Sequence, residues 1–472
     1  MIGSKRPKTT AKNEIQTVID MIRQRPGAIS ESGIERLAKS YGLEVFKEDT
    51  KDGKRISLGG RIVLVDIDMI FPARKIVKVT MSLANALSAD MAQEQAAVDG
   101  ILLADLQSPT LDRFAKNLDR IARQDRLSTA QIDNFHAVAT LYLTALTKIY
   151  KHELEVGRDA ENEGHGKPIM NGDGVVGLSI LYWTDRHRVP SSKSNRYRVL
   201  VEIDESTGSR GVVQTNAYLD PEFDLAAKPT MWQEPDYTGL EDQVAGYVLV
   251  LDPPVAVPFY DAAILDPSSE LSSEISKSTT STNNPLYSSR TVFDSAGNSI
   301  LYRFSLAASP AADMQIVDRI YISHPRQIYS VFEILRQSLF TQSLLSSVFA
   351  PRWLTPPPSP STYPSLSDFL STSVPSQVAP SKVSIKLQTL YGQPSKLSMI
   401  IPTKSFTSAP ASTALLTSFT ALIQRNALVK CTSLSVNEQS EFANKSQLES
   451  SIENVLQTAE DLGIMAHWLR EQ

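Results

Sequence analysis

The chain of 472 residues contains a single cysteine, Cys431, so no disulfide can form within it. A lone cysteine fits a reducing compartment such as the cytosol or the nucleus. There is no run of about 18 apolar residues, and the N-terminus is polar from Ser4 onward, so we expect neither a membrane span nor a signal peptide. Lys and Arg number 47 against 52 Asp and Glu, which gives a net charge of −5. This deficit of basic residues argues against direct nucleic-acid binding. The lone cysteine and the lack of a membrane span or signal peptide together predict a soluble intracellular protein.

The sequence also lacks a complete motif for binding a nucleotide or a metal. The glycines at 172, 174 and 177 spell G-x-G-x-x-G, but they lead into a strand pattern, so no helix N-terminus is available for a pyrophosphate. Asp66 and Asp68 form a D-x-D on one strand face, as in some metal-dependent transferases. No third acidic ligand is evident nearby, so an ordinary solvated face is the better explanation.

Catalytic signatures are equally incomplete. His152-Glu153 begins like the helix of a zinc protease, but Val156 occupies the position of the second histidine ligand. No G-x-S-x-G turn supports a serine nucleophile, and Cys431 lies in an apolar strand pattern typical of a core residue. We therefore predict no catalytic residue, no cofactor and no metal site, and a protein that is not an enzyme.

Residues 30–125 carry the clearest structural patterns of the chain. Apolar residues at 34, 37, 38 and 41 predict a helix, with Ser32 and Glu35 as its capping box and Gly42 just past its end. Two alternating segments, residues 55–69 and 74–84, predict strands. Gly59-Gly60 is the signal of a two-residue hairpin, so we expect the first pair of strands to be antiparallel.

Three helices are expected after these strands. Residues 91–102 indicate the first, Ser108 with Pro109 predicts the start of the second, and Ser128 with Gln131 forms the capping box of the third. The predicted core of the whole block consists of Leu37, Tyr41, Leu43, Val63, Val65, Phe114, Leu118 and Ile121. Off the apolar face of the second helix lie four candidate partner contacts, for which solvated surface is the alternative: Asn117, Asp119, Arg120 and Arg123.

The order and spacing of these pieces resemble the N-terminal domain of fungal subunit one of the Mediator complex of RNA polymerase II transcription. The resemblance rests on SGIERLAKSYGLEVF, ISLGGRIVLVDIDM, IVKVTMSLA and FAKNLDRIARQD, with GLSILYW following at residues 177–183. It is strongest over residues 27–150, thinner to about 265, and beyond that it rests on architecture. Because these motifs are hydrophobic patterns, they identify a family without identifying a site.

The resemblance implies a nuclear, non-enzymatic architectural subunit of the Mediator middle module. Such a subunit is a transcription coactivator that bridges regulatory factors and RNA polymerase II through other Mediator subunits, without direct contact with nucleic acid or membrane. Animal members bind nuclear receptors through L-x-x-L-L helices, a helix-in-groove mode. The leucine pairs of this chain are preceded at the required position by Asp99, Thr341 and Ser412 instead of leucine. We therefore do not expect this chain to bind nuclear receptors in this way.

Two alternatives remain open. One is a scaffold of another large assembly of the tethering or kinetochore type, and the other is an enzyme whose pocket is invisible in one sequence. Four basic residues near the N-terminus form a candidate nuclear-import signal, with a simple charged tail as the alternative: Lys5, Arg6, Lys8 and Lys12.

Composition shifts predict an α/β chain of the α+β type, with mixed or antiparallel sheets, packed helices and at least two domains joined by disordered linkers. The expected order is a basic tail with the start of a first helix (1–26), an N-terminal α/β domain (27–150), a linker or loop (151–174), a β-rich region (175–265), a disordered Ser/Thr-rich loop (266–290), a strand and helix region (291–350), a Pro/Ser-rich linker (351–380) and a C-terminal α/β region (381–472).

Within these regions we expect strands at 175–183, 196–204, 245–252, 299–306, 382–390 and 396–401, and helices at 327–349 and 411–426. The C-terminal segment, residues 446–472, has apolar residues at heptad-like spacing, which predicts one amphipathic helix. The helix either covers its own domain or binds a partner. In the second case the contact residues are Leu448, Ile452, Val455, Ala459 and Leu462.

Overall fold

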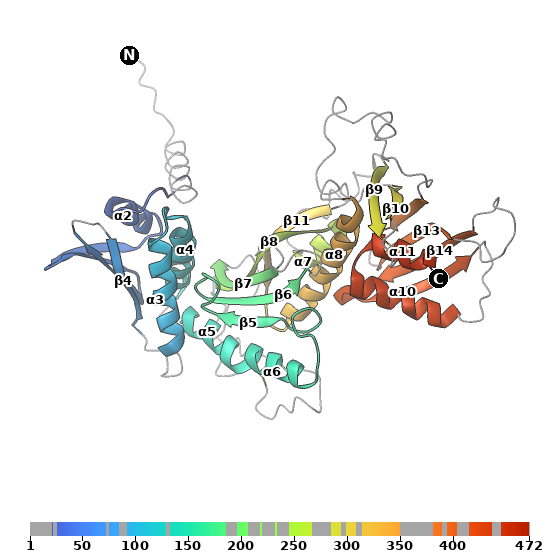
Figure 1. Ribbon diagram of the computed structural model, residues 1–472. Coiled ribbons are helices and arrows are strands. Elements are labelled where there is room, and N and C mark those ends of the chain that lie inside the picture. Colours follow the sequence, from blue (N-terminus) through green and yellow to red (C-terminus); the bar gives the residue numbers. More distant parts are fainter. Residues whose placement is uncertain are drawn as a thin grey trace, which may run out of the picture. The chain divides into compact units, whose positions relative to one another are not determined.

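The computed structural model describes residues 21, 26–71, 75–84, 92–128, 133–185, 196–205, 218–219, 232–233, 245–266, 285–293, 299–307, 314–349, 381–388, 394–403, 415–436 and 445–471 (Figure 1). They form two compact units. Unit 1 comprises Met1–Tyr182, Arg198–Asp252 and Arg319–Gln327, and unit 2 comprises Trp183–Tyr197, Pro253–Asp318 and Ile328–Gln472. The predicted α+β class is confirmed, since helices pack beside sheets that are mostly antiparallel.

Several predicted segments fall outside this description. They are most of the basic tail at 1–26, most of the Ser/Thr-rich segment at 266–290 and all of the Pro/Ser-rich segment at 351–380. The two units also interleave along the chain, whereas the predicted regions follow one another.

A four-stranded antiparallel sheet opens unit 1. Its strands follow in sequential order: β1 (Glu44–Thr50), β2 (Gly53–Gly59), β3 (Val63–Ile70) and β4 (Lys75–Leu83). Register places Val45, Leu58, Val65 and Met81 in one row, so apolar side chains cross the sheet on one face. The antiparallel pairing expected around Gly59 is confirmed, although residues 60–62 separate the two strands instead of a two-residue turn. Strand β1 was not predicted.

Helix α2 (Glu31–Ser40) precedes the sheet, and its start differs from the prediction. The N-cap is Ser30, whose Oγ accepts the Gly33 N–H at 3.1 Å, so the capping box at Ser32 was wrong. Glu35 contributes no cap and instead accepts hydrogen bonds from Lys39 and Lys47, at 2.6 Å each. Gly42 has φ +84°, which confirms the predicted helix end, because glycine adopts this left-handed conformation at no steric cost.

Three further helical segments follow in unit 1: α3 (Ala92–Leu106), α4 (Asp112–Leu127), and α5 (Asn134–Leu141), which continues through a π-helical turn at Tyr142–Leu146 into α6 (Thr147–Glu155). Two predicted starts are corrected. Helix α4 has Leu111 as its N-cap, without a side-chain cap, and the Ser108 hydroxyl instead lies 2.7 Å from the carbonyl oxygens of Asp105 and Thr110. Helix α5 is capped by Asp133, whose carboxylate accepts the N–H groups of Phe135 and His136.

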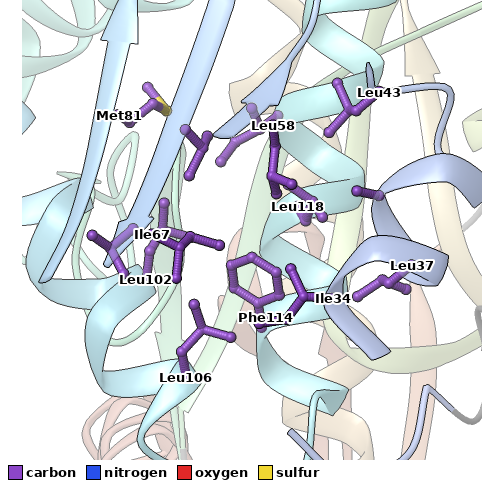
Figure 2. Packing of buried hydrophobic residues seen from close by; sticks show 14 of the residues in the cluster. Ile34, Leu37, Leu43, Leu58, Ile67, Met81, Leu102, Leu106, Phe114 and Leu118 are labelled. Atoms are coloured by element: carbon purple, nitrogen blue, oxygen red, sulfur yellow. The ribbon is translucent and has the colours of Figure 1, made fainter. Parts of the chain in front are cut away.

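The sheet and helices α2 to α4 share one hydrophobic core. All eight predicted core residues are buried in it, which confirms that prediction. Figure 2 shows Ile34 and Leu37 of α2, Ile67 of β3, and Phe114 and Leu118 of α4 in this cluster. Full burial of one such side chain contributes roughly 1.5–3 kcal/mol, so the periodic apolar stripe of each helix accounts for much of this layer's cohesion.

A second sheet of five strands has the order β11-β8-β7-β6-β5. The strands are β5 (Lys167–Met170), β6 (Leu178–Thr184), β7 (Arg196–Glu205), β8 (Ala245–Pro258) and β11 (Met314–Ile322). Three of them, β6, β7 and β8, confirm predicted strands. Strands β5 and β11 were not predicted, and the segment expected as a linker at 151–174 contains the end of α6 as well as β5.

Unit 2 is built on a six-stranded sheet with the order β15-β14-β13-β12-β10-β9. The strands are β9 (Leu286–Phe293), β10 (Ser299–Leu306), β12 (Ser381–Gln388), β13 (Ser395–Thr403), β14 (Leu415–Ile423) and β15 (Val429–Val436). Only the pairing of β10 with β12 is parallel. The helix predicted at 411–426 was wrong, since this segment forms β14. Its buried residues alternate with exposed or half-buried ones, and this period of two lets one face pack on the core.

Helices complete unit 2. They include α7 (Phe259–Leu265) and α8 (Gln327–Phe349), and the bounds of α8 match the prediction. The single C-terminal helix that was predicted is two helices, α10 (Lys445–Ala459) and α11 (Leu462–Glu471), separated at Glu460, whose φ is +49°. Helix α10 packs against β15, and α11 packs against β13 and β9. Among the described helices, none is both long enough and apolar enough to cross a membrane.

Candidate functional site: the polar face of helix α4

Asn117 is the centre of the polar face of α4, and it is only 1% exposed. Its amide nitrogen donates to the carboxylate of Asp105 at 2.6 Å and to the carbonyl of Gly174 at 3.1 Å. Its amide oxygen accepts from the Val176 N–H and from Arg120 Nη1, both at 3.0 Å. The side chain therefore uses both donor hydrogens and its acceptor, and it connects α3, α4 and the loop before β6.

Glu202 on β7 receives two guanidinium groups from the same helix. Arg120 Nε lies 2.8 Å from Oε1, and Arg123 Nη1 lies 2.6 Å from Oε2. Glu202 is only 7% exposed, so this carboxylate needs partners of opposite charge. Because each of its oxygens has an arginine donor, the arrangement binds α4 to the second sheet through charge-assisted hydrogen bonds.

Further charges extend the cluster and balance it. Arg123 also donates to Asp119, one turn earlier on α4, and Arg319 of β11 donates to Asp204 of β7. Three arginines thus face three carboxylates, with Asp204 lying 3.9 Å from Arg123 Nη1. An internally neutral network is less costly to bury than an excess of either charge.

The ionisation of two members reflects this environment. Burial alone would lower the pKa of Arg123, but the carboxylates of Asp119, Glu202 and Asp204 outweigh burial, and the pKa is raised. Burial raises the pKa of Asp105, against the opposing effects of Asn117, Arg113 and Arg120. Arg113 Nε lies 3.2 Å from Asp105 Oδ1 without hydrogen-bond geometry, which leaves that oxygen with electrostatic pairing only.

Asp125, at the end of α4, is a structural anchor of this region that the sequence reasoning missed. Its buried carboxylate accepts three consecutive backbone N–H groups of the β2–β3 loop, from Arg61 at 2.7 Å, Ile62 at 2.8 Å and Val63 at 3.0 Å. A Cβ added at Gly60 would overlap this carboxylate. The available signal was an aspartate on the helix's polar margin together with a glycine pair in a hairpin.

A small cavity lies beside this face of α4. Its volume is about 50 Å³, and it is lined mostly by apolar side chains, among them Val98, Ile121, Phe135 and Val138. Ligand pockets usually reach roughly 300–1,000 Å³, so this cavity is too small for a substrate or cofactor.

All four residues predicted as partner contacts on α4 are therefore brought together, but in contacts with their own chain. Asn117, Arg120 and Arg123 are held by β7 and by the loop around Gly174, and only Asp119 keeps about a third of its side chain exposed. The expectation of a solvated surface is wrong for the first three, because they pack against residues distant in the sequence.

The predicted contact residues at the C-terminus are divided between core and margin. Ile452 and Leu462 are fully buried within unit 2, whereas Leu448, Val455 and Ala459 are half-buried. The helices thus cover their own sheet. Ile452 and Leu462 have no exposed side-chain surface with which to contact a partner in this structure. The three half-buried positions remain predictions as partner contacts.

The motifs that suggested chemistry have structural partners. Asp66 accepts a hydrogen bond from Ser57 at 2.6 Å, and Asp68 pairs with Arg55 at 2.7 Å. Burial raises the pKa of Cys431 to about 11, with Glu449 and Glu453 adding to the effect, so this thiol stays protonated. Within the described residues, no three His, Cys, Asp or Glu side chains gather closely enough to hold a metal ion.

The fold and the α4 cluster define a class of protein: an α+β chain of two compact units, in which a charged helix face joins elements of its own unit. The chain belongs to the family described as Mediator of RNA polymerase II transcription subunit 1, of the fungal type, whose family model matches residues 16–350. A relative with this same description, from Schizosaccharomyces pombe, is 34% identical over 160 residues. That match covers 33% of this chain and 35% of the relative, so it spans about a third of the relative's length.

Proposed function

We propose that the chain is a non-enzymatic architectural subunit of the Mediator complex, placed in its middle module, and that it acts as a transcription coactivator. Family membership over residues 16–350 is the observation that carries the assignment. It favours Mediator over the alternative of a tethering or kinetochore scaffold. The subunit would bridge regulatory factors and RNA polymerase II indirectly, through contacts with neighbouring Mediator subunits.

The α4 cluster supports an architectural role. Arg120, Arg123 and Glu202 fasten the first α/β layer of unit 1 to strand β7, and Asp125 fastens the β2–β3 loop to the same helix. A surface whose supporting elements are fixed loses little conformational entropy when a partner binds, and this favours stable association. The charged groups of this cluster pair with one another and fix the positions of their elements, whereas catalysis requires a group poised to react with a substrate.

Co-purification tests this proposal. The full-length chain, tagged at its natural expression level, is purified from nuclear extract, and the proteins recovered with it are identified by mass spectrometry. We expect the subunits of Mediator, with those of the middle module most abundant. Recovery of a tethering or kinetochore assembly, without Mediator subunits, would contradict the proposal.

Nuclear localisation belongs to the same proposal. The basic residues Lys5, Arg6, Lys8 and Lys12 are the candidate import signal. A variant with all four changed to glutamine is expected to lose nuclear accumulation when it is expressed without its partners. If this variant stays nuclear under that condition, import does not depend on the basic tail.

A further inference from the structure

The six strands of the unit 2 sheet contain no carboxylate. In a chain where 52 of 472 residues are aspartate or glutamate, the described strands β9, β10, β12, β13, β14 and β15 include neither. They do include five lysine or arginine residues besides Arg290. Four of these strands, β12 to β15, also lie beyond the residues matched by the family model.

The basic residues gather on one face of this sheet. In β12 the buried residues Val383 and Ile385 alternate with the exposed residues Lys382, Ser384 and Lys386, so the two faces differ in character. Helices α10 and α11 contact the buried face, where Glu453 accepts the backbone N–H of Cys431. The face carrying the lysines is turned away from these helices, and we call it the outer face.

Lysines and hydroxyl groups make up much of the outer face. Lys386 is in one row with Ser398, Thr420 and Ser433 of the neighbouring strands. In the next row Leu422 lies between Lys396 and Lys430. Exposed apolar side chains are also present, since Ile400 is 45% and Leu416 52% exposed. Among the described residues, no carboxylate forms an ion pair with Lys382, Lys386, Lys396 or Lys430.

The first sheet of unit 1 provides the contrast. Its outward row runs Glu48, Arg55, Asp68 and Lys78 from β1 to β4, with charges that alternate in sign. Arg55 Nε and Asp68 Oδ1 lie 2.7 Å apart in that row. The charges of this row pair with one another, whereas the strands of the unit 2 outer face carry only positive charge, which makes that face electrostatically complementary to an anionic partner.

We propose that the outer face of the six-stranded sheet binds an acidic polypeptide segment in which aspartate or glutamate is interspersed with apolar residues. The lysines supply charge complementarity, the serine and threonine hydroxyls supply hydrogen bonds, and Ile400 and Leu416 supply apolar contact. This interaction surface is independent of the α4 cluster.

Charge spacing favours a polypeptide over a nucleic acid. Lys382 and Lys386 are four residues apart on one strand, about 13 Å, and Lys396 and Lys430 are two strands apart, about 10 Å. Each strand of a duplex carries one phosphate charge per roughly 3.4 Å of helix axis, a higher charge density than these lysines provide. The overall charge of −5 also opposes a dense polyanion at long range.

The test uses the full-length chain and a fluorescein-labelled 15-residue peptide of aspartate, leucine and phenylalanine, followed by fluorescence anisotropy. We expect saturable binding that weakens with added salt. Lys382→Ser with Lys386→Ser should weaken it about fivefold to tenfold, because two ion pairs are lost. The charge-conserving pair Lys382→Arg with Lys386→Arg should keep the affinity. Both substituted positions are solvent-exposed, and circular dichroism checks that each variant is folded.

The matched control is Lys75→Ser with Lys78→Ser on β4, two exposed strand lysines outside the outer face, and it should leave the affinity unchanged. Equal loss in both serine variants, or no binding of the peptide, would overturn the proposal. Tighter binding of a 15-nucleotide single-stranded DNA than of the peptide would assign the face to nucleic acid instead. Self-association of the chain that the Lys382 and Lys386 substitutions abolish would assign it to a second copy. None of these outcomes depends on whether Mediator subunits co-purify.

Discussion

Arg120 of helix α4 and Glu202 of strand β7 are 82 positions apart in the chain, and their side chains meet with Nε 2.8 Å from Oε1. The sequence predicted this face of α4 as a candidate surface for binding a partner, but in the structure it binds another element of the same chain. The polar face of α4 packs against strand β7 within unit 1 and is therefore not free to bind a partner. Partners must contact other surfaces of the unit.

Changing Glu202 to glutamine should lower the free energy of unfolding by about 3 kcal/mol, because two partly buried guanidinium groups lose the buried carboxylate that pairs with them. Chemical denaturation followed by circular dichroism measures the change. Asp252→Asn on β8 is the matched control. Its carboxylate also pairs with an arginine, Arg198, at 2.8 Å, but it is half exposed, so the expected change is below about 1 kcal/mol. Equal changes in the two variants would show that the Glu202 cluster is not a buried clamp.

Gly60→Ala should destabilise unit 1 by about 2 kcal/mol or more, because the added Cβ displaces Asp125 from three backbone N–H groups whose loss of an acceptor is costly. Thermal unfolding gives the readout. Gly100→Ala in α3 is the comparison, since a Cβ there meets nothing within 4 Å, and it should stabilise the helix by up to about 1 kcal/mol. The account fails here if both alanines shift the melting temperature in the same direction.

Asp105 should make unit 1 less stable as pH rises. Burial raises the pKa of the Asp105 carboxyl above its ordinary value, so the folded state holds this proton more tightly than the unfolded state does. The resulting loss of stability is absent below the ordinary pKa, grows as pH rises toward the raised pKa, and is complete above it. Asp105→Asn removes this titration. Between the ordinary pKa and the raised pKa, the free energy of unfolding of the variant should therefore increase relative to that of the natural protein as pH rises. Parallel pH profiles would contradict the assignment.

The two C-terminal helices offer a test of core against surface. Ile452→Ala should cost unit 2 about 2–5 kcal/mol, because Ile452 is fully buried and its truncation leaves a cavity. Ile464→Ala, at a side chain that is 43% exposed, should change stability by no more than about 0.5 kcal/mol. Hydrogen exchange of the β15 amides reports the same difference. If Ile452→Ala leaves stability intact and weakens binding to a partner, the stripe is an interface.

The sequence predicted those helices and core positions that depend on residue spacing within one segment. Helix α8 follows from a long apolar segment without helix breakers, and the core positions of α2 and α4 follow from their period of 3.6 residues. Residues 411–426 were assigned the wrong structure because alanine, leucine and glutamine favour helices. In the fold, Phe419, Ala421 and Ile423 alternate onto the sheet's buried face, and tertiary packing overrides that preference.

The sequence predicted the α4 residues of the site but not their partners on other elements. Helical periodicity placed Asn117, Arg120 and Arg123 off the apolar face, which is correct. It carries no information about Glu202, which reaches the helix through the pairing of distant segments. The role of Asp125 escaped for the same reason, since its partners are backbone groups more than 60 positions away.

Cross-linking mass spectrometry of the purified intact complex tests the architectural claim most directly, because it detects contacts between neighbouring subunits. The lysines exposed on unit 1 supply the reactive positions, among them Lys75, Lys78, Lys116, Lys148 and Lys151. We predict cross-links from these lysines to other Mediator subunits, chiefly those of the middle module. A chain that co-purifies but cross-links only to itself, or to proteins outside Mediator, would contradict the account.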